Sequence, residues 1–350
     1  RYDRRHRDTV RAMTEADRQG ALERWLGAEL AARGEHAAGA PVALVADASF
    51  RRFARLTTDA GTRIVVDAPP ERENNAGFLA VAAWLEAREL AAPRVLAADP
   101  AAGFLLVTDL GDDTLARCLD APDADPAALL DAAVGALLDF QAAGADGSGP
   151  FPPYDAARLA QENGLFGSWC LAGLLGLPAT PPVLEETLRA LTAVHLEAPR
   201  VAVHLDWHGR NLMVTEAGRI AMVDFQDARS GPQGYDLVSL LRDCYRTHAP
   251  ELVERSISHF LAGARTRGLP GVDDAAAFRR RFDLLGIQRQ LKALGIFARL
   301  HLREGRDHAL PDMPRTLDHV LAVAPAHGET AALGAWLAEE VAPRLETLRP

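Results

Sequence analysis

Two short segments in the second half of the chain carry side chains suited to phosphoryl transfer. One reads His-Leu-Asp-Trp-His-Gly-Arg-Asn over residues 204–211, and the other reads Val-Asp-Phe-Gln over residues 223–226. The reaction uses a carboxylate that orients a hydroxyl group and accepts its proton, together with oxygen ligands for a hard cation such as Mg²⁺. We therefore predict that Asp206 is the hydroxyl partner and that Asn211 and Asp224 hold magnesium.

The spacing of these residues predicts how the backbone brings them together. Short apolar runs at 211–214 and 220–225 flank a turn that contains Gly218, which is typical of a β-hairpin. Such a hairpin would carry Asp224 back toward Asp206, although 18 positions separate the two in the sequence.

Several neighbouring residues have two interpretations. His204 is expected to hydrogen-bond the loop backbone rather than to act as a general base. Asp236 opens a predicted helix, where it either caps the helix or braces the loop 204–211. His208 is either a plain loop side chain or a contact for substrate or phosphate.

The first third of the chain combines short strand patterns with two helical patterns. Apolar spacing predicts a leading helix over 14–32 and a second helix over 71–88. Turn-forming residues separate the strands, which indicates an antiparallel arrangement. The expected strands cover residues 42–45, 50–56, 63–66, 94–97 and 104–107.

Beyond residue 113 the pattern is almost wholly helical, apart from a strand over 201–204 and the hairpin. The expected helices cover residues 126–143, 155–175, 182–197, 235–247, 250–267, 273–303 and 329–341. The sequence thus predicts an α+β fold in which a small antiparallel sheet precedes a helical lobe.

Composition argues against several classes of protein. The chain has 350 residues and a net charge of −10, whereas a general nucleic-acid or anionic-membrane surface needs clustered basic charge. Its three cysteines lie far apart, which indicates neither a disulfide framework nor a zinc site. The longest apolar runs are too short to span a bilayer. We expect a cytoplasmic protein with no nucleic-acid, membrane or obligate protein partner.

The loop 204–211 and the segment 223–226 resemble the catalytic and metal-binding loops of the protein-kinase-like superfamily. Leu205 and Gln226 differ from the arginine and glycine usual in protein kinases, so the likeness is to the aminoglycoside and choline phosphotransferase branch. Within it the chain is similar to the anomeric sugar kinases of the AmgK type, which phosphorylate N-acetylmuramate and N-acetylglucosamine at the C1 hydroxyl. Residues 47–53, 65–71, 107–115, 204–213, 223–245 and 288–300 carry this likeness.

The resemblance implies a bilobal protein-kinase-like fold, with a small antiparallel-sheet N-lobe and a mainly helical C-lobe. The implied parts are a leader or extension over 1–12, the N-lobe over 13–107, a hinge over 108–114 and the C-lobe over 115–350. ATP and Mg²⁺ would bind between the lobes, and a small amino sugar would be the acceptor. The expected product is the α-1-phosphate, formed in peptidoglycan recycling.

The phosphate contacts depart from the protein-kinase pattern, which places a lysine on the third strand. Lys292 is the only lysine among the 38 basic residues, so the third-strand region 63–67 has none. Arginine must therefore hold the phosphates. Our candidates are Arg51 and Arg52, with Arg63 as a further possibility.

The resemblance assigns the remaining ligand contacts. Ser49 lies in the segment where a nucleotide-covering turn is expected, and the main chain of Asp109 and Leu110 is expected to meet the adenine edge. A basic group near the acceptor would pair with the lactyl carboxylate of muramate. The expected acceptor contacts are Glu162, His208, Gln226, Asp227, Arg289 and Lys292.

Two other functions remain open from the sequence. A kinase of an aminoglycoside would have a densely acidic pocket, and a choline kinase would have an aromatic cage, which the aromatic content of 6% mildly disfavours. A nucleotide-binding pseudokinase adaptor would explain the missing third-strand lysine, but it would not need all of Asp206, Asn211 and Asp224.

Overall fold

The computed structural model describes residues 15–44 and 50–348, which form two compact units. The first unit comprises the described residues up to Ala76 together with Arg94–Asp109. The second comprises Gly77–Pro93 together with Leu110 and the described residues after it. The chain therefore passes between the units at positions 76–77, 93–94 and 109–110.

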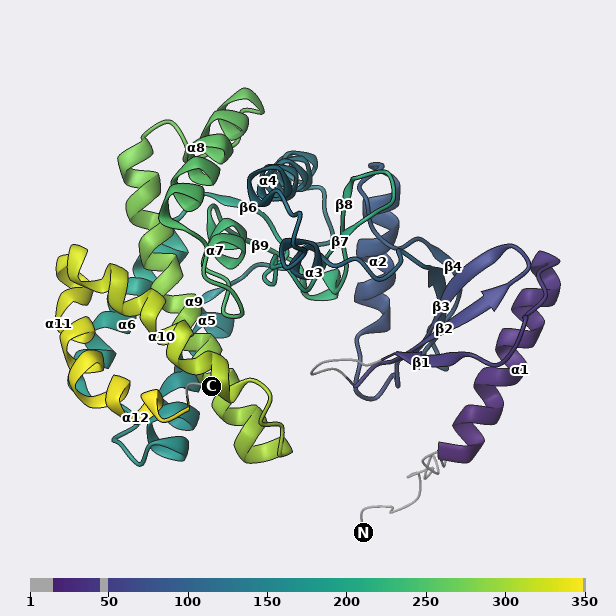
Figure 1. The fold of residues 1–350 in the computed structure, drawn as a ribbon, viewed down its shortest axis with the longest axis horizontal. Coiled ribbons are helices and arrows are strands. Elements are labelled where there is room, and N and C mark those ends of the chain that lie inside the picture. The colour runs from purple at the N-terminus through teal and green to yellow at the C-terminus, as the bar shows by residue number, and fades with distance from the viewer. Residues whose placement is uncertain (1–14, 45–49, 349–350) are drawn as a thin grey trace, which may run out of the picture. The chain divides into compact units, whose positions relative to one another are not determined.

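A five-stranded antiparallel sheet with the strand order β1-β2-β3-β5-β4 forms the centre of the first unit (Figure 1). The strands are β1 Val42–Leu44, β2 Arg52–Thr58, β3 Gly61–Asp67, β4 Val95–Asp99 and β5 Phe104–Thr108. Gly61, with φ of +107°, lets the chain reverse tightly between β2 and β3. The predicted antiparallel sheet is confirmed, although the strand expected over 50–56 begins at Arg52 and ends at Thr58.

Helix α1, Glu15–Arg33, covers one face of this sheet. Successive side chains of a strand point to opposite faces, so alternate residues of β2, β3 and β5 face the helix. The apolar cluster between them contains Leu26, Leu30, Leu56, Val65 and Leu106. The two faces of the sheet therefore have different surroundings, and each arginine of β2 and β3 can be assigned to one of them.

Helix α2, Asn75–Glu86, lies almost wholly in the second unit. Its Phe78 ring stacks on Phe225 at 5.0 Å between ring centroids, and its Trp84 ring meets Phe151 edge-on at 4.8 Å. The helix was expected from residue 71, but the turn after Pro69 and Pro70 delays its start to Asn75. These aromatic contacts place α2 with the helical unit.

The second unit is mainly helical and is organised around the long helix α9, Ala275–Glu304 (Figure 1). Apolar residues on several sides of α9 are buried, because α5, α6, α7, α10 and a π-helical segment pack against it. The other helices are α3 Leu115–Leu119, α4 Pro126–Ala143, α5 Ala156–Leu165, the π-helical Phe166–Leu174, α6 Pro182–Glu197, α7 Tyr235–Leu241, α8 Pro250–Thr266, α10 Met313–Val323, α11 Gly328–Trp336, the π-helical Leu337–Val341 and α12 Ala342–Glu346. The predicted helical lobe is thus confirmed, whereas α3, α10 and α12 were not predicted.

Two small antiparallel strand pairs interrupt the helices of the second unit. Strand β7, Leu212–Val214, pairs with β8, Ile220–Met222, which confirms the predicted hairpin. Strand β6, Arg200–Val203, agrees with the strand expected over 201–204, whereas its partner β9, Arg229–Pro232, was not predicted. The strand expected to run to residue 225 ends at Met222, and Asp224 turns the chain with φ of +64°.

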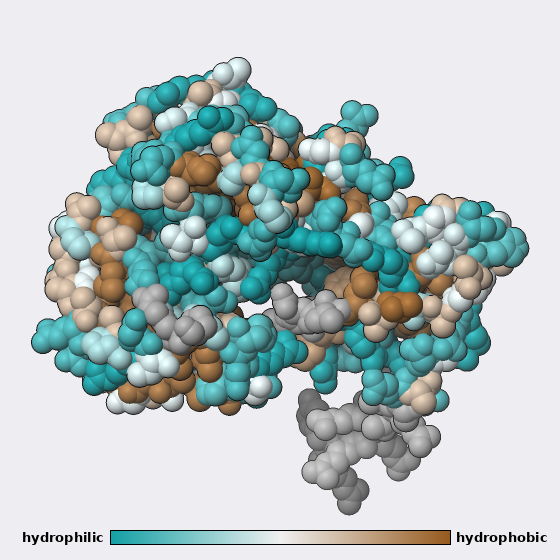
Figure 2. All heavy atoms as spheres, viewed as in Figure 1, coloured by the Kyte–Doolittle hydropathy of each residue, from teal (hydrophilic) through white to brown (hydrophobic). Residues whose placement is uncertain are grey.

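Helix α4 is long and apolar enough to cross a membrane by length and composition alone. In this structure it packs against α8, and residues including Leu130, Val134 and Leu137 are buried. These contacts are those of a core helix. On the face drawn in Figure 2 hydrophilic residues predominate, and hydrophobic ones occur in small groups.

Candidate active site

The loop 204–211 connects β6 to β7, and hydrogen bonds to Val223 hold both of its ends. His204 is buried, and its ring Nε2 lies 2.9 Å from the carbonyl oxygen of Val223 at the end of the hairpin. The backbone N–H of Val223 donates to the carbonyl oxygen of Asn211 at 3.0 Å. His204 therefore has the structural role that was expected for it.

Asp236 braces this loop from helix α7. Its carboxylate accepts the backbone N–H of His204 at 2.6 Å and that of Leu205 at 2.9 Å. Leu205 has φ of +79°, a left-handed conformation that is costly for a side chain of this size. Burial raises the pKa of Asp236 to about 6, although the two N–H groups favour the charged carboxylate. Of the two interpretations of Asp236, the structure supports the bracing one.

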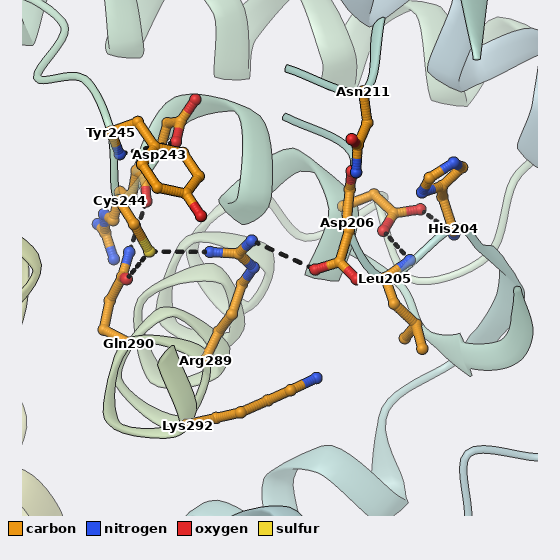
Figure 3. A network of polar contacts seen from close by, with 12 residues as sticks. His204, Leu205, Asp206, Asn211, Asp243, Cys244, Tyr245, Arg289, Gln290 and Lys292 are labelled. Carbon is orange, nitrogen blue, oxygen red and sulfur yellow. Dashed lines mark hydrogen bonds and ion pairs between the residues drawn. The ribbon is translucent and has the colours of Figure 1, made fainter. Parts of the chain in front are cut away.

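The β7–β8 hairpin places Asn211 beside the segment that carries Asp224. Leu212 pairs with Met222, so Asn211 directly precedes the first residue of β7 and Asp224 comes two positions after the last residue of β8, at the same end of the hairpin. The side-chain amide of Asn211 donates to the carbonyl oxygen of Asp206 at 3.1 Å, and Figure 3 shows Asn211 beside Asp206. Their roles in catalysis remain predictions, but the local geometry is compatible with them.

Asn211 and Asp224 form a donor set suited to a hard cation. The amide nitrogen of Asn211 is engaged by Asp206, so its carbonyl oxygen remains available as a ligand. Asp224 is exposed, and one carboxylate oxygen accepts from Nε2 of Gln226 at 2.6 Å. Over residues 15–44 and 50–348 no three His, Cys, Asp or Glu side chains gather as a metal site. Magnesium typically takes only one or two protein carboxylates and keeps several waters, so this arrangement fits it.

Helix α9 presents Arg289 and Lys292 toward Asp206 (Figure 3). Nη2 of Arg289 lies 3.8 Å from Oδ1 of Asp206, and Nη1 lies 3.6 Å from Sγ of Cys244. Desolvation raises the pKa of Asp206, but the positive charges of Lys292 and Arg289 outweigh this and lower it. The carboxyl group therefore stays ionised below its ordinary range, as a proton acceptor requires.

Lys292 is committed to a buried ion pair with Glu162 of helix α5. Nζ of Lys292 lies 3.1 Å from Oε2 of Glu162, and Nε of Arg158 donates to Oε1 at 2.6 Å. The hydroxyl group of Tyr154 also donates to Glu162. Burial raises the pKa of Glu162, but Lys292, Tyr154 and Arg158 lower it by more. Glu162 therefore anchors a cluster of donors rather than presenting an uncompensated negative charge.

The other expected acceptor contacts lie around the same loop. The ring of His208 meets Tyr245 edge-on at 5.6 Å, and burial lowers the pKa of His208, which favours its neutral form. Asp227 is exposed in the short 3₁₀ turn Phe225–Asp227 that follows the hairpin. Gln226 lies in the same turn and reaches Asp224.

The expected nucleotide contacts are divided between the units. Ser49 lies outside the described residues. Asp109 lies at the end of the first unit, and Leu110 begins the next segment of the second. Arg51 is buried, whereas Arg52 is half exposed and pairs with Asp67.

Sequence reasoning missed several partners of these residues. Tyr154 and Arg158 contact Glu162, and Arg55 binds Asp109. The i,i+4 spacing of Arg158 and Glu162 on a predicted helix was a readable signal. No local pattern indicated the other two contacts.

A cavity of about 100 Å³ adjoins the loop 204–211 at Gly209 and Arg210. Its lining includes Leu115, Asp120, Tyr245 and Arg246 but not Asp206, Asn211 or Asp224. We therefore do not assign the phosphoryl-transfer chemistry to this cavity.

Comparisons with known proteins agree with this arrangement. Residues 42–278 match the phosphotransferase enzyme family. A protein of Neisseria meningitidis serogroup B named N-acetylmuramate/N-acetylglucosamine kinase is 38% identical over 302 residues, covering 85% of this chain and 89% of that protein. A Pseudomonas aeruginosa protein of the same name is 38% identical over 295 residues, covering 83% and 86%.

Solved structures share the fold at low sequence identity. A choline/ethanolamine kinase family protein from Mesorhizobium loti matches with a TM-score of 0.62 and 18% identity, covering 90% of this chain and 99% of that one. The APH(2")-IIa enzyme in complex with gentamicin matches with a TM-score of 0.59 and 12% identity, covering 89% and 97%. The predicted kinase-like fold is thereby confirmed. The chain belongs to the phosphotransferase enzyme family and is a phosphotransferase acting on an alcohol-type acceptor.

Proposed function

We propose that this enzyme transfers the γ-phosphoryl group of ATP to the anomeric C1 hydroxyl of N-acetylmuramate, N-acetylglucosamine or both. The observation that carries the proposal is that Asn211 hydrogen-bonds the backbone of Asp206 and that of Val223, the neighbour of Asp224. The names of the relatives at 38% identity supply the acceptor class. Related structures determined with ATP or AMP support the donor.

Asp206 is the proposed proton acceptor. It takes the proton of the C1 hydroxyl as that oxygen bonds to the γ-phosphorus and the bond from the γ-phosphorus to the ADP oxygen breaks. An anomeric hydroxyl is more acidic than an ordinary sugar hydroxyl, so a carboxylate of low pKa is a sufficient base. The low pKa of Asp206 also keeps it unprotonated before the reaction.

Asn211 and Asp224 are the proposed magnesium ligands. Bound magnesium would neutralise charge on the phosphates. Gln226 orients the carboxylate of Asp224 through their 2.6 Å hydrogen bond. His204 and Asp236 act only by holding the loop backbone in place.

The acceptor side of Asp206 is rich in donors and positive charge. Arg289 and Lys292 approach it from α9, and Glu162 balances only part of this charge because Arg158 binds it as well. A carboxylate on the acceptor, such as the lactyl group of muramate, would pair with Arg289. A polycationic aminoglycoside would be repelled by the same charges, which disfavours that alternative.

The proposed product is the α-1-phosphate, and the proposed setting is cytoplasmic recycling of peptidoglycan sugars. The test incubates the protein with ATP, Mg²⁺ and a panel of N-acetyl sugars, aminoglycosides and choline. Phosphorus-coupled NMR then identifies the phosphorylated position. We expect coupling between phosphorus and the C1 proton of an N-acetyl sugar, whereas transfer only to an aminoglycoside or choline would refute the proposal.

A further inference from the structure

We propose that Arg51 holds the nucleotide phosphates and that Glu73 positions it. This arginine–glutamate pair would replace the lysine–glutamate pair that positions phosphates in protein kinases. The inference rests on the proposed function, because it takes ATP as the phosphoryl donor. Its structural evidence comes from contacts within the first unit alone.

The third strand supplies no cation on the face opposite α1. Strand alternation puts Ile64 and Val66 of β3 on that face, and both are apolar. Arg63 and Asp67 lie on the α1 face, together with Val65 of the apolar cluster. An acidic residue therefore ends the strand on which a protein kinase carries its lysine.

Arg52 and Arg63 are committed to partners on the α1 face. Arg52 lies directly opposite Asp67 in the β2–β3 register, and its Nη2 is 2.8 Å from Oδ2 of that residue. Arg52 also pairs with Glu15 of α1. Nε of Arg63 lies 3.2 Å from Oε2 of Glu35, beyond the end of α1. Both arginines thus connect the sheet to the α1 region.

The side chain of Arg51 lies on the face of the sheet opposite to that of Arg52 and Arg63. Arg51 directly precedes β2. If the alternation of side chains in β2 is continued back by one residue, Arg51 lies on the same face as Phe53, away from α1. Its side chain is 3% exposed, and its Nη2 lies 3.3 Å from Oε2 of Glu73. The other oxygen of Glu73 accepts the backbone N–H of Phe50 at 3.2 Å. One carboxylate therefore fixes both the guanidinium group and the end of the β1–β2 connection.

The side chain of Asp109, whose main chain is the expected adenine contact, lies on the same face as Arg51. Asp109 comes directly after β5 and two positions after Val107, so the side chains of both residues point to the same face. Val107 lies opposite Ile64, which is on the face away from α1. The carboxylate of Asp109 binds Nε and Nη2 of Arg55 at 2.6 Å and 3.1 Å, so Arg55 is held at Asp109, whereas Arg51 lies four residues earlier, beside the start of β2. Arg51 is thus the arginine of β2 and its N-terminal flank placed to serve phosphates on this face.

A guanidinium group can perform both tasks at once. It has five N–H donors in a planar fork, so one edge can bind Glu73 while another binds phosphate oxygens. Glu73 would preset the orientation of that fork, which lowers the entropy lost on binding. Low exposure strengthens the attraction between the cation and a phosphate.

The test measures binding of ATP with Mg²⁺, and of adenosine, to the full chain by calorimetry. We expect Arg51→Gln to weaken ATP binding about tenfold or more, as loss of a charge-assisted contact should, and to change adenosine binding less than about twofold. Arg52→Gln and Arg63→Gln test the two rival arginines, and each is expected to change ATP affinity less than about threefold. Equal losses for ATP and adenosine, or a larger ATP loss in Arg52→Gln, would overturn the assignment.

Glu73→Gln tests the positioning role. We expect it to raise the KM for ATP with a smaller effect on kcat, and to add little to Arg51→Gln, because it acts through that arginine. Glu73→Asp should recover part of the loss. Independent, additive effects of the two substitutions would show that Glu73 does not act through Arg51.

Two further measurements, the ATP affinity of a second Arg51 variant and sugar phosphorylation by the parent enzyme, separate this inference from the proposed function. If Arg51→Gln does not fold, Arg51→Lys replaces it, and unchanged ATP affinity in that variant would overturn the proposal that the guanidinium fork of Arg51 joins Glu73 to the phosphates. Sugar phosphorylation by the parent enzyme is followed in parallel. A parent that binds ATP through Arg51 without phosphorylating an N-acetyl sugar would refute the proposed acceptor but uphold this inference.

Discussion

The carboxylate of Asp236 accepts the backbone N–H of Leu205 at 2.9 Å, and Leu205 has a left-handed φ of +79°. A non-glycine residue in this region costs about 1–3 kcal/mol unless its surroundings hold it. The adjacent residue is Asp206, so the hydrogen bond to Asp236 fixes the backbone from which the proposed base projects.

We predict that Asp236→Asn lowers both stability and kcat. An asparagine offers one carbonyl oxygen, so one of the two buried N–H groups loses its acceptor, at a cost of about 1–3 kcal/mol. A displaced loop should lower kcat about ten- to a hundredfold. Urea unfolding and steady-state kinetics measure the two effects. Asp139→Asn, which breaks an exposed pair with Arg267, is the control and should cost less than about 1 kcal/mol.

The buried pair of Glu162 and Lys292 gives a second prediction. Their side chains are 6% and 11% exposed, so Glu162→Gln would leave a buried lysine without its counter-charge. We expect a loss of about 3–5 kcal/mol in the free energy of unfolding. The double change Glu162→Gln with Lys292→Met should recover part of it. A loss no larger than that of Glu340→Gln, from an exposed pair with Arg344, would contradict the buried character of this pair.

The pH dependence of stability follows from the lowered pKa of Glu162. A carboxyl group with a folded pKa below its ordinary 4.5 contributes stability that is complete above that value. The contribution is lost as the pH falls through the folded pKa. The stability gap between the parent and Glu162→Gln should therefore be widest near pH 7 and narrow below pH 4.5. Thermal unfolding across this range measures it, and a gap that widened on acidification would refute the assignment.

Arg289 should influence which acceptor is used. The guanidinium group lies 3.8 Å from the Asp206 carboxylate and is the candidate partner for an acidic acceptor. We predict that Arg289→Gln lowers kcat/KM for N-acetylmuramate about tenfold more than for N-acetylglucosamine, because only the former carries a carboxylate. Arg303→Gln, on the exposed end of the same helix, should leave the ratio unchanged. An unaltered ratio in Arg289→Gln would remove this role.

Local sequence patterns predicted the elements whose formation depends on neighbouring residues, such as turns and the strands that flank them. The turn at Gly218 and its apolar flanks were sufficient to predict the hairpin, and the hairpin explains why Asn211 lies beside Val223, the neighbour of Asp224. Strand β9 could not be read in the same way, because it is only Arg229–Pro232 and depends on pairing with β6. Pairing across long sequence separations leaves no local signature.

Ion pairs between residues far apart in the chain could not be predicted from the sequence either. Glu162 and Lys292 are 130 positions apart, and only the packing of α5 on α9 joins them. The arginines of β2 are an intermediate case. Alternation separates Arg51 from Arg52, but the choice between them requires knowing which face of the sheet α1 covers.

Asp206 is the residue on which the proposed chemistry depends, and Asp206→Asn tests it most directly. Single-turnover transfer from ATP to N-acetylglucosamine is measured together with ATP affinity. Removing the proton acceptor should slow transfer about a hundredfold or more, while ATP affinity stays within about threefold of the parent. A variant that transfers the phosphoryl group at nearly the parental rate would contradict the proposed role of Asp206.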